Sequence, residues 1–533
     1  MSKCGVILCE CNGTLERRIS LQELSRFIHN VAPDLDIIVG NNLCKPHELN
    51  LLLEKSEVYP SVIGACNEIH SHAHFWQDID TNKPNPFFTK IVNVLSEIKS
   101  DFSDVEVSDR VKLLLGSQIS KAFCCEAVSN DNLRLRFSPS QDQITRRNLL
   151  SVLSPKHEVI PSILSGDCLG TDCKLCADIC PIDAIADTHN TLKIDKSACT
   201  GCGACVSTCP RGAISYPGYS VAEMEREIEG LLSKRIELPY RILSIVCQSC
   251  LNTDDTSLKT ISPNIFTITV PSLSIVSPLL LLHAFNMGTD GIVLIHDEQN
   301  CSSKMSIQTL NNAVRFVQQL FERWGIDKNR IGYINKANNP EVHGDLRKFV
   351  GMITTLGHTP LKTIAGSMTF EGMYNLAAII KEMDEKLQLP DEGVFIDECV
   401  PFGSVNIDQS HCTGCAICTQ HCPTGAISTQ ISDDSSNLKL EFQHNKCIAC
   451  GICINICPEK CIRFRKVLDF ARLSDLKETI FENEFVICHN CSKPYATKSM
   501  IDILKHKLEK AGVFSTEWTQ YCPPCRVVIQ QKR

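Results

Sequence analysis

The sequence has no long apolar run and no secretory leader. Its longest apolar stretch, around residues 279–282, is far shorter than the roughly 20 residues that a membrane-spanning helix needs. The first residues, MSKCGVILCECNG, lack a basic segment followed by a long apolar one, so no signal peptide is predicted. We therefore expect a cytoplasmic protein without membrane insertion, whose cysteines are available as thiols.

An excess of positive charge and the common cofactor fingerprints are missing as well. The chain has 53 Lys and Arg against 61 Asp and Glu, a net charge of −8, which argues against nucleic acid as a partner. No G-x-G-x-x-G motif follows a predicted strand, so neither flavin nor nicotinamide is expected. With no P-loop and no nucleophile–base pair, the sequence does not indicate a stand-alone enzyme.

What the chain does have is cysteine, 32 of them in 533 residues. A disulfide framework is typical of small secreted domains, whereas a chain of this length without a leader and with clustered C-x-x-C pairs is expected to bind metal. The length itself suggests roughly three to five domains. Two blocks that start at Cys168 and Cys412 each contain two copies of one cysteine pattern, about 200 residues apart.

The repeated pattern is C-x2-C-x2-C-x3-C-P, the signature of ferredoxins with two 4Fe-4S clusters. Three copies match it fully, and they begin at Cys199, Cys412 and Cys447. The first three thiolates of a copy lie on one tight loop around a cluster, and the fourth reaches the other cluster of the pair. In the remaining copy, Gly170 stands where the first ligand is expected and Cys168 lies nearby. We predict a full cluster there, the alternatives being a 3Fe-4S cluster or none.

Pairing the copies predicts four ligand sets, each with three cysteines from one copy and one from the other. A set of zinc sites is the alternative, which the C-P endings and the tandem pairing disfavour. The sets are Cys168, Cys173, Cys176 and Cys209 for the first cluster; Cys199, Cys202, Cys205 and Cys180 for the second; Cys412, Cys415, Cys418 and Cys457 for the third; and Cys447, Cys450, Cys453 and Cys422 for the fourth.

The end of the chain carries a separate group of cysteines. Two C-x-x-C pairs, Cys488 with Cys491 and Cys522 with Cys525, flank a helix expected at 499–510. Four thiolates so arranged suit a closed tetrahedral zinc site. A single rubredoxin-type iron needs the same ligands, so the sequence leaves zinc and iron open and zinc is the preferred reading.

Other cysteines follow predicted strands. Two groups stand at the ends of strands, and the remainder are expected to bind no metal, as is a histidine-rich stretch read as a surface turn. The first group either binds a fifth cluster or is ordinary buried cysteine, and it consists of Cys9, Cys11, Cys44 and Cys66. The second group is expected to bind no cluster and consists of Cys247, Cys250 and Cys301 with His296. The remaining cysteines are Cys124, Cys125, Cys399 and Cys461, and the histidines are His70, His72 and His74.

The rest of the chain alternates strand and helix patterns. Such alternation predicts parallel sheets, and the fold class is multidomain α/β plus α+β with two ferredoxin-like modules. Strands are expected at 6–9, 36–39, 61–65, 241–247, 264–270, 291–295 and 331–334, with helices at 21–30, 49–55, 278–285 and 306–324. The predicted layout is an α/β domain at 1–100, a linker or partly folded extension at 101–165, a ferredoxin module at 166–218, an α/β domain at 219–345, a connector at 346–400, a second ferredoxin module at 401–466, and a zinc-ribbon-like module at 467–533.

Several segments resemble known redox proteins. The stretches GVILCECNG, NNLCKP and VIGACNEIHSHAHF resemble the start of the heterodisulfide reductase flavoprotein subunit. The middle, from ILSIVCQSC through HAFNMGTDGIVLI to RWGIDKNRIGYI, resembles the delta subunit of methyl-viologen-reducing hydrogenase, which carries a 2Fe-2S cluster; here Pro271 and Ser272 stand where that subunit would have a cysteine. The whole order, ending in VPFGSVNID, CHNCSKPYATKSM and YCPPCR, resembles the bacterial 4Fe-4S proteins found near formate dehydrogenase genes.

The motifs and the resemblance together predict an electron-transfer protein with four 4Fe-4S clusters. The expected partners are redox proteins, such as a formate dehydrogenase-like or heterodisulfide reductase-like dehydrogenase. The alternative is a maturation or scaffold protein for a molybdenum or tungsten oxidoreductase. A catalytic subunit with its own substrate is the least favoured reading.

Overall fold

The computed structural model describes residues 4–10, 17–40, 61–66, 89–93, 102–124, 130–136, 156–188, 191–233, 236–251, 261–298, 307–336, 342–363, 376–513 and 515–531. The chain divides into two compact units, residues 1–168 with 174–372 and residues 169–173 with 373–533. The predictions made for Cys11, Cys44, Cys125, Cys301 and the three histidines lie outside the described residues, and of Cys66 only the backbone is described. No helix within the described ranges is both long and apolar enough to cross a membrane.

The N-terminal part of the first unit is a parallel sheet with strand order β2-β1-β3-β4. The predicted strands at 6–9, 36–39 and 61–65 are found, and the helix expected at 49–55 lies outside the described residues. Helix α1 begins after Ser20, whose hydroxyl accepts the N–H of Glu23 at 3.3 Å. The bounds are β1 Cys4–Cys9, α1 Leu21–Val31, β2 Asp36–Gly40, β3 Ser61–Cys66 and β4 Thr89–Asn93.

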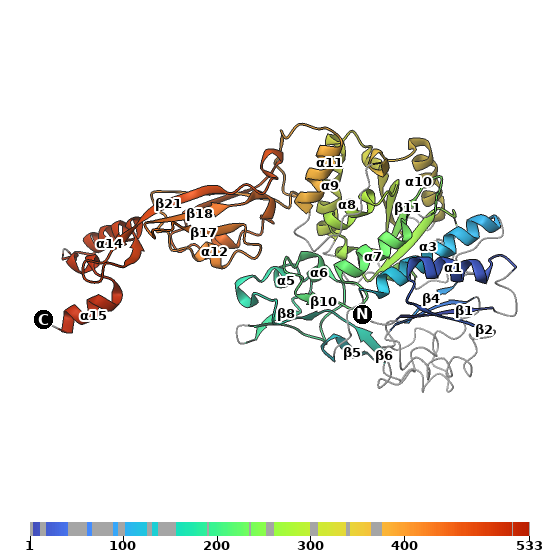
Figure 1. The fold of residues 1–533 in the computed structure, drawn as a ribbon, viewed down its shortest axis with the longest axis horizontal. Helices are drawn as coiled ribbons and strands as arrows, with labels where there is room; N and C mark the ends of the chain where they lie inside the picture. Colours follow the sequence, from blue (N-terminus) through green and yellow to red (C-terminus); the bar gives the residue numbers. More distant parts are fainter. Residues whose placement is uncertain are drawn as a thin grey trace. The chain divides into compact units, whose positions relative to one another are not determined.

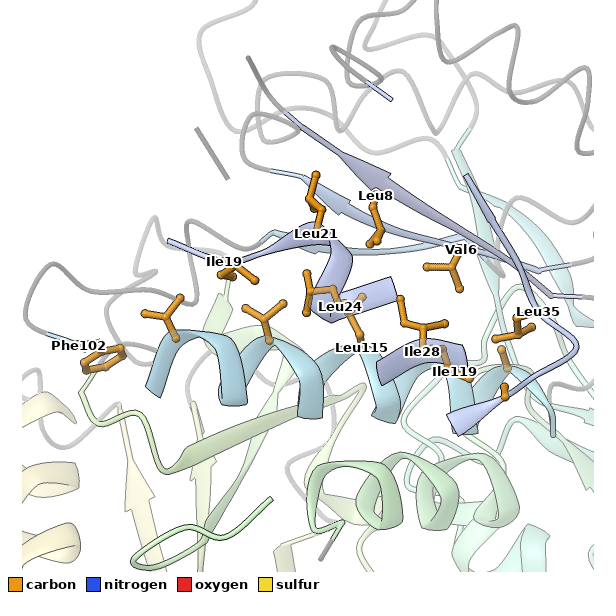
Figure 2. Packing of buried hydrophobic residues seen from close by; sticks show 14 residues of the cluster. Val6, Leu8, Ile19, Leu21, Leu24, Ile28, Leu35, Phe102, Leu115 and Ile119 are labelled. Atoms are coloured by element: carbon orange, nitrogen blue, oxygen red, sulfur yellow. The ribbon is translucent and has the colours of Figure 1, made fainter. Parts of the chain in front are cut away.

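A long helix occupies part of the stretch that the sequence left as a linker or partly folded extension. Helix α3 (Asp104–Ala122) starts with a capping box, in which the side chains of Ser103 and Glu106 each bind the other's backbone N–H. Figure 2 shows the side chains of β1 and α1, among them Leu8 and Leu24, pointing toward α3. This helix therefore closes the core of the N-terminal sheet.

The other side of α3 packs closely on α7 (Val221–Leu231). Gly230 lies against the backbone of Ser117, because a β-carbon built on Gly230 would come within 2.3 Å of the Ser117 Cα. The buried ammonium of Lys121 contacts the Glu227 carboxylate at 2.5 Å, and the Ser117 hydroxyl donates to the Glu227 carbonyl at 3.0 Å. The helix pair joins the N-terminal sheet to the rest of the first unit.

The first motif block consists of short hairpins and two short helices. Both helices begin directly after a residue with positive φ, and the motif cysteines lie on and beside these helices. The elements are β5 Leu133–Arg136 with β6 Lys156–Val159, β7 Ser162–Ile163 with β10 Ile214–Ser215, β8 Ile185–Thr188 with β9 Thr191–Ile194, α5 Leu175–Asp178 and α6 Ala204–Thr208.

The middle of the first unit is a second parallel sheet, with strand order β12-β11-β13-β14. This is the order of the N-terminal sheet repeated, and Figure 1 shows α7, α8 and α9 close to it. Strands β11 and β13 are buried along their whole length, which explains their continuous apolar sequences. The bounds are β11 Ile242–Cys247, β12 Ile265–Val270, η11 Leu273–Ile275, α8 Pro278–Asn286, β13 Gly291–His296, α9 Ile307–Arg323, β14 Ile331–Asn335 and α10 Val342–Leu356.

In the second unit the second motif block shares a sheet with the tail. The antiparallel order is β17-β18-β21-β22, so the long strand β21 pairs with the motif block on one side and with the tail strand β22 on the other. The bounds are α11 Leu376–Lys386, β15 Val394–Phe395, β16 Gly403–Ile407, α12 Ile417–Gln420, β17 Ile427–Ile431, β18 Asn437–Phe442, α13 Ile452–Ile456, β19 Ile462–Lys466, β20 Leu468–Asp469, β21 Glu478–Ile487, β22 Pro494–Thr497, α14 Lys498–Lys510 and α15 Pro523–Gln531.

Candidate cysteine-lined centres

Two cavities are each lined by one complete predicted ligand set. The first, with about 340 Å³ of space that includes solvent at its mouth, is walled by apolar side chains such as Ile185 and Ile194 and by the set predicted for the second cluster, Cys180, Cys199, Cys202 and Cys205. The other, of the same size, is walled by Phe442, Phe464 and the set predicted for the fourth cluster, Cys422, Cys447, Cys450 and Cys453. In both, the one cysteine that comes from the partner motif lies with the other three.

The set predicted for the third cluster also gathers in one place. The Cys418 thiol lies within electrostatic range of Cys412, Cys415 and Cys457, and also of Cys453 from the fourth set. A further thiol, Cys461, lies there as well, with its Sγ 3.6 Å from the Sγ of Cys457. The sequence pattern placed Cys461 outside the ligand sets; its position beside Cys457 is set by the fold of the loop after Pro458.

The four cysteines predicted for the first cluster, Cys168, Cys173, Cys176 and Cys209, line neither of the two cavities. Lys174 has a φ of 52°, the left-handed conformation that the matching residue of every other motif adopts. The part of this motif from residue 173 onward therefore follows the common backbone pattern, whereas its first loop is the part that differs in sequence.

The cysteine-bearing loop of each full motif turns tightly because two of its residues adopt a left-handed backbone conformation. These are the residues two and four positions after the first cysteine: Gly201 and Gly203, Gly414 and Ala416, and Ala449 and Gly451. Glycine adopts this conformation at little cost, and a β-carbon on Gly203 or Gly414 would come within 3 Å of Ile275 or Thr497. The turn aims the N–H of Gly201 at the Cys199 Sγ, 3.4 Å away, and the N–H of Gly414 at the Cys412 Sγ, 3.5 Å away.

The environment of these thiols favours their protonated form when no positive charge is present. Burial raises the pKa values of Cys418, Cys447 and Cys453 to about 12, and it raises that of Cys205 well above its ordinary range. Neighbouring thiols add to the shift in each case. Iron ions supply the positive charge that stabilises several thiolates in one apolar cavity, so these residues fit an iron–sulfur cluster and its binding releases protons.

The tail cysteines form a tighter group. Among the described residues, Cys488, Cys491, Cys522 and Cys525 alone bring three or more ligand atoms within 4.8 Å of one another. The Sγ atoms of Cys491 and Cys522 are 3.7 Å apart, close to the roughly 3.8 Å that a tetrahedron with 2.3 Å metal–sulfur bonds requires. The backbone N–H of Cys522 and the side-chain amide of Asn490 each donate to a thiol of the group. The spacing fits one tetrahedral metal ion.

The cysteines of the two parallel sheets lie at the carboxyl ends of their strands. Cys9 is buried at the end of β1, and Cys66 ends the neighbouring strand β3. Cys247 ends β11 and His296 ends the adjacent strand β13, and both are buried. In parallel sheets this edge is where ligands usually bind. The fifth-cluster hypothesis for the N-terminal sheet depends on residues outside the described ones and stays a prediction.

A contact that sequence reasoning missed joins the middle sheet to the first motif block. The segment η11 packs on α6, where the Ser274 hydroxyl donates to the Cys202 carbonyl at 2.9 Å. The side chain of Ile275 fills the space that a β-carbon on Gly203 would occupy. The residues that would carry a cysteine in the hydrogenase-like pattern, Pro271 and Ser272, stand immediately before this segment. No spacing rule could have found a contact between residues about 70 positions apart.

Family models match three parts of the chain. Residues 242–357 match the model described as methyl-viologen-reducing hydrogenase, delta subunit. Residues 192–215 match a 4Fe-4S binding domain, and residues 404–458 match a 4Fe-4S dicluster domain. The dicluster match covers both copies of the second motif block.

Individual relatives are redox proteins. The chain is 31% identical over 67 residues to a protein named Ferredoxin 7Fe from Hydrogenibacillus schlegelii, which covers 13% of this chain and 86% of that protein. It is 31% identical over 177 residues to one component of the ferredoxin:CoB-CoM heterodisulfide reductase of Methanosarcina acetivorans, covering 33% of this chain and 22% of the relative. One component of an ion-translocating oxidoreductase complex from the same organism is 41% identical over 59 residues, 11% of this chain and 22% of the relative. The chain thus spans only about a fifth of the two complex components.

Proposed function

We propose that this chain, which belongs to the ferredoxin-type 4Fe-4S proteins, carries single electrons through four 4Fe-4S clusters between a dehydrogenase and a second redox protein. Its match to the hydrogenase delta-subunit model supports the same role. The four predicted ligand sets hold these clusters, and the tail group holds one zinc ion. The dehydrogenase is of the formate dehydrogenase or heterodisulfide reductase type.

The observation that carries this proposal is the match between the ligand sets and the cavities. The pairing rule assigns Cys180 to the cluster bound by Cys199, Cys202 and Cys205, and Cys180 lines the same cavity as these three cysteines. It likewise assigns Cys422 to the cluster bound by Cys447, Cys450 and Cys453, and Cys422 lines their cavity. Cavities walled by apolar side chains and thiols suit a redox cluster, because exclusion of water and N–H groups near sulfur are what tune its potential. Tandem modules of this kind are built for transfer between neighbouring clusters.

The clusters are tested by metal analysis of the full chain purified without oxygen. About 16 iron and 16 sulfide per chain with one zinc are expected, and about 20 iron would add the N-terminal cluster. Cys450→Ser should lower the iron content by about four, whereas Cys399→Ser, a buried thiol outside every predicted set, should leave it unchanged. A colourless protein with zinc in the cavities would overturn the proposal.

Electron transfer is tested separately by an EPR-monitored redox titration with the dehydrogenase present. Clusters that become reduced when the dehydrogenase receives its substrate support the proposal. Clusters that neither the dehydrogenase nor any low-potential donor can reduce would count against electron transfer. A strain that lacks this protein and makes its dehydrogenase without the dehydrogenase's own cofactor would also count against it. That last result would favour a role in maturation.

A further inference from the structure

The tail of the second unit touches one cluster-binding loop directly. Thr497, the last residue of β22, is almost completely buried, at 2% exposure. Its hydroxyl donates a hydrogen bond to the carbonyl of Thr413, which lies between two of the cysteines predicted for the third cluster. Its methyl group occupies the space beside Gly414, because a β-carbon there would lie 2.9 Å from the Thr497 Cγ2.

This contact acts on a single peptide unit. The carbonyl of Thr413 and the N–H of Gly414 belong to the same planar amide. The carbonyl end is held by Thr497, and the N–H end points at the Cys412 Sγ, 3.5 Å away. A donor on the carbonyl polarises the amide and fixes its plane, so the same contact strengthens and orients the N–H directed at the sulfur.

A second contact from the tail reaches the other side of the same ligand set. The Lys507 ammonium on α14 lies 2.8 Å from the carboxylate of Glu459, two residues after the fourth ligand Cys457. Because this pair is partly exposed, it contributes less than the buried contact at Thr497. Both contacts from β22 and α14 therefore end on loops that carry ligands of the third cluster.

The same strand is also tied to the tail metal group. Strand β22 begins at Pro494, three residues after Cys491. The Tyr495 hydroxyl donates to the Thr519 carbonyl near the second cysteine pair, and the Cys488 N–H donates to the Lys493 carbonyl at 3.0 Å. A metal ion bound by the four thiols therefore fixes the beginning of the short strand that ends at Thr497.

We propose that Thr497 is a positioning residue for the third cluster, and that metal bound by the tail cysteines raises the reduction potential of this cluster alone through it. The proposal rests on the cluster assignment above. A reduced cluster carries more negative charge than an oxidised one, so a well-aimed N–H at the Cys412 sulfur stabilises the reduced form. Release of the Thr413 carbonyl weakens that N–H and disfavours reduction.

The test is an EPR-monitored redox titration of the full chain, with the third and fourth cluster signals assigned from Cys415→Ser and Cys450→Ser. Thr497→Val keeps the packing on Gly414 and removes the hydroxyl, whereas Thr497→Ser keeps the hydroxyl. Cys491→Ser removes the tail metal without touching Thr497. Lys498→Gln is the matched control, since Lys498 is the next residue, the first of α14, and pairs only weakly with exposed Glu484, at 4.0 Å.

Thr497→Val and Cys491→Ser should each decrease the reduction equilibrium constant of the third cluster about fivefold, the scale of one hydrogen bond. For one electron this is about 40 mV, since a tenfold change is about 59 mV. Thr497→Ser and Lys498→Gln should change the reduction equilibrium constant of the third cluster less than twofold. The reduction equilibrium constant of the fourth cluster should change less than twofold in every variant.

An unchanged or raised potential in both Thr497→Val and Cys491→Ser overturns the proposal, as does an equal change at both clusters. If only Thr497→Val acts, Thr497 has its local role but the link to the tail metal is refuted. Because Thr497 also caps α14, the zinc content of Thr497→Val is measured first, and Cys491→Ser tests the link independently if that variant misfolds. Absence of a cluster at Cys412 in the unaltered protein would instead refute the proposed function.

Discussion

Replacement of Gly230 by alanine should destabilise the first unit by about 2 kcal/mol. A β-carbon at Gly230 would lie 2.3 Å from the Cα and 2.6 Å from the N of Ser117, and 2.9 Å from the carbonyl carbon of Gly116. All three are backbone atoms, so no side-chain rotation relieves the overlap and the two helices must separate. Overpacking of this kind costs about 3 kcal/mol at the upper end of its usual range, and the better helix propensity of alanine offsets about 1 kcal/mol.

A matched control has the opposite expected sign. Gly351 also lies inside a helix, α10, but a β-carbon there would have no atom within 4 Å. Gly351→Ala should therefore stabilise its helix by about 1 kcal/mol, because only the propensity term remains. The pair of variants separates close packing from intrinsic helix preference.

The measurement should be local, because a chain with several domains does not unfold in a single two-state step. Amide hydrogen exchange of α3 and α7 in the anaerobic protein reports the free energy of opening of each helix. Gly230→Ala should accelerate exchange in both helices roughly 30-fold, the factor that corresponds to 2 kcal/mol. If exchange slows in Gly230→Ala as it does in Gly351→Ala, the close approach of α3 and α7 is refuted.

Three further predictions concern single residues, two of them beside the candidate centres. Burial raises the pKa of Glu225 to about 7, so the first unit should lose stability as pH rises from about 4.5 through 7, by roughly 3 kcal/mol in total. Glu225→Gln should abolish this slope in the free energy of opening of α7, measured by hydrogen exchange between pH 5.5 and 8 and corrected for the intrinsic pH dependence of exchange, and an unchanged slope would assign it to other groups. Ser274→Ala removes the donor to the Cys202 carbonyl and should speed the bleaching in air of one cluster by a fewfold, while equal bleaching rates would show that the contact is dispensable. In Gly403→Ala a β-carbon would lie 3.1 Å from the Cys447 Sγ and closer still to an aromatic ring, so iron content should fall by about four per chain, and a full complement of iron would disprove the crowding.

Local patterns were sufficient to predict all four strands of the middle sheet and three of the four strands of the N-terminal sheet, where β4 was missed. Strand β13 was expected at 291–295 and runs Gly291–His296, because an apolar run rich in branched residues and bounded by turn residues suits a buried strand. The grouping of Cys180 with Cys199 and Cys422 with Cys447 in two cavities follows from a spacing rule that encodes a short local loop and one exchange between neighbouring loops. Both kinds of inference need only residues that are near in sequence or in a repeated motif.

Features that depend on distant residues could not be read in the same way. Helix α3 was missed as part of the core because its sequence, DVEVSDRVKLLLGSQISKA, mixes polar and apolar residues on several faces, two of which are buried against different elements. The hydrogen bond from Thr497 to Thr413 joins residues 84 positions apart, and neither side chain belongs to a metal motif. Cys461 was assigned no role because its position after Cys457 follows no ligand spacing, yet the turn after Pro458 brings the two sulfurs together.

The shared strand β21 has a consequence for how the protein can be shortened. Residues from Glu478 to Glu484 of this strand pair with β18, and the last three, from Phe485 to Ile487, pair with β22. A fragment that ends before Glu478 would leave one edge of β18 with unpaired backbone N–H and C=O groups. These groups can pair with another copy of the fragment, which favours self-association. A second ferredoxin module expressed without its tail should consequently aggregate, and a soluble fragment has to extend at least through Ile487.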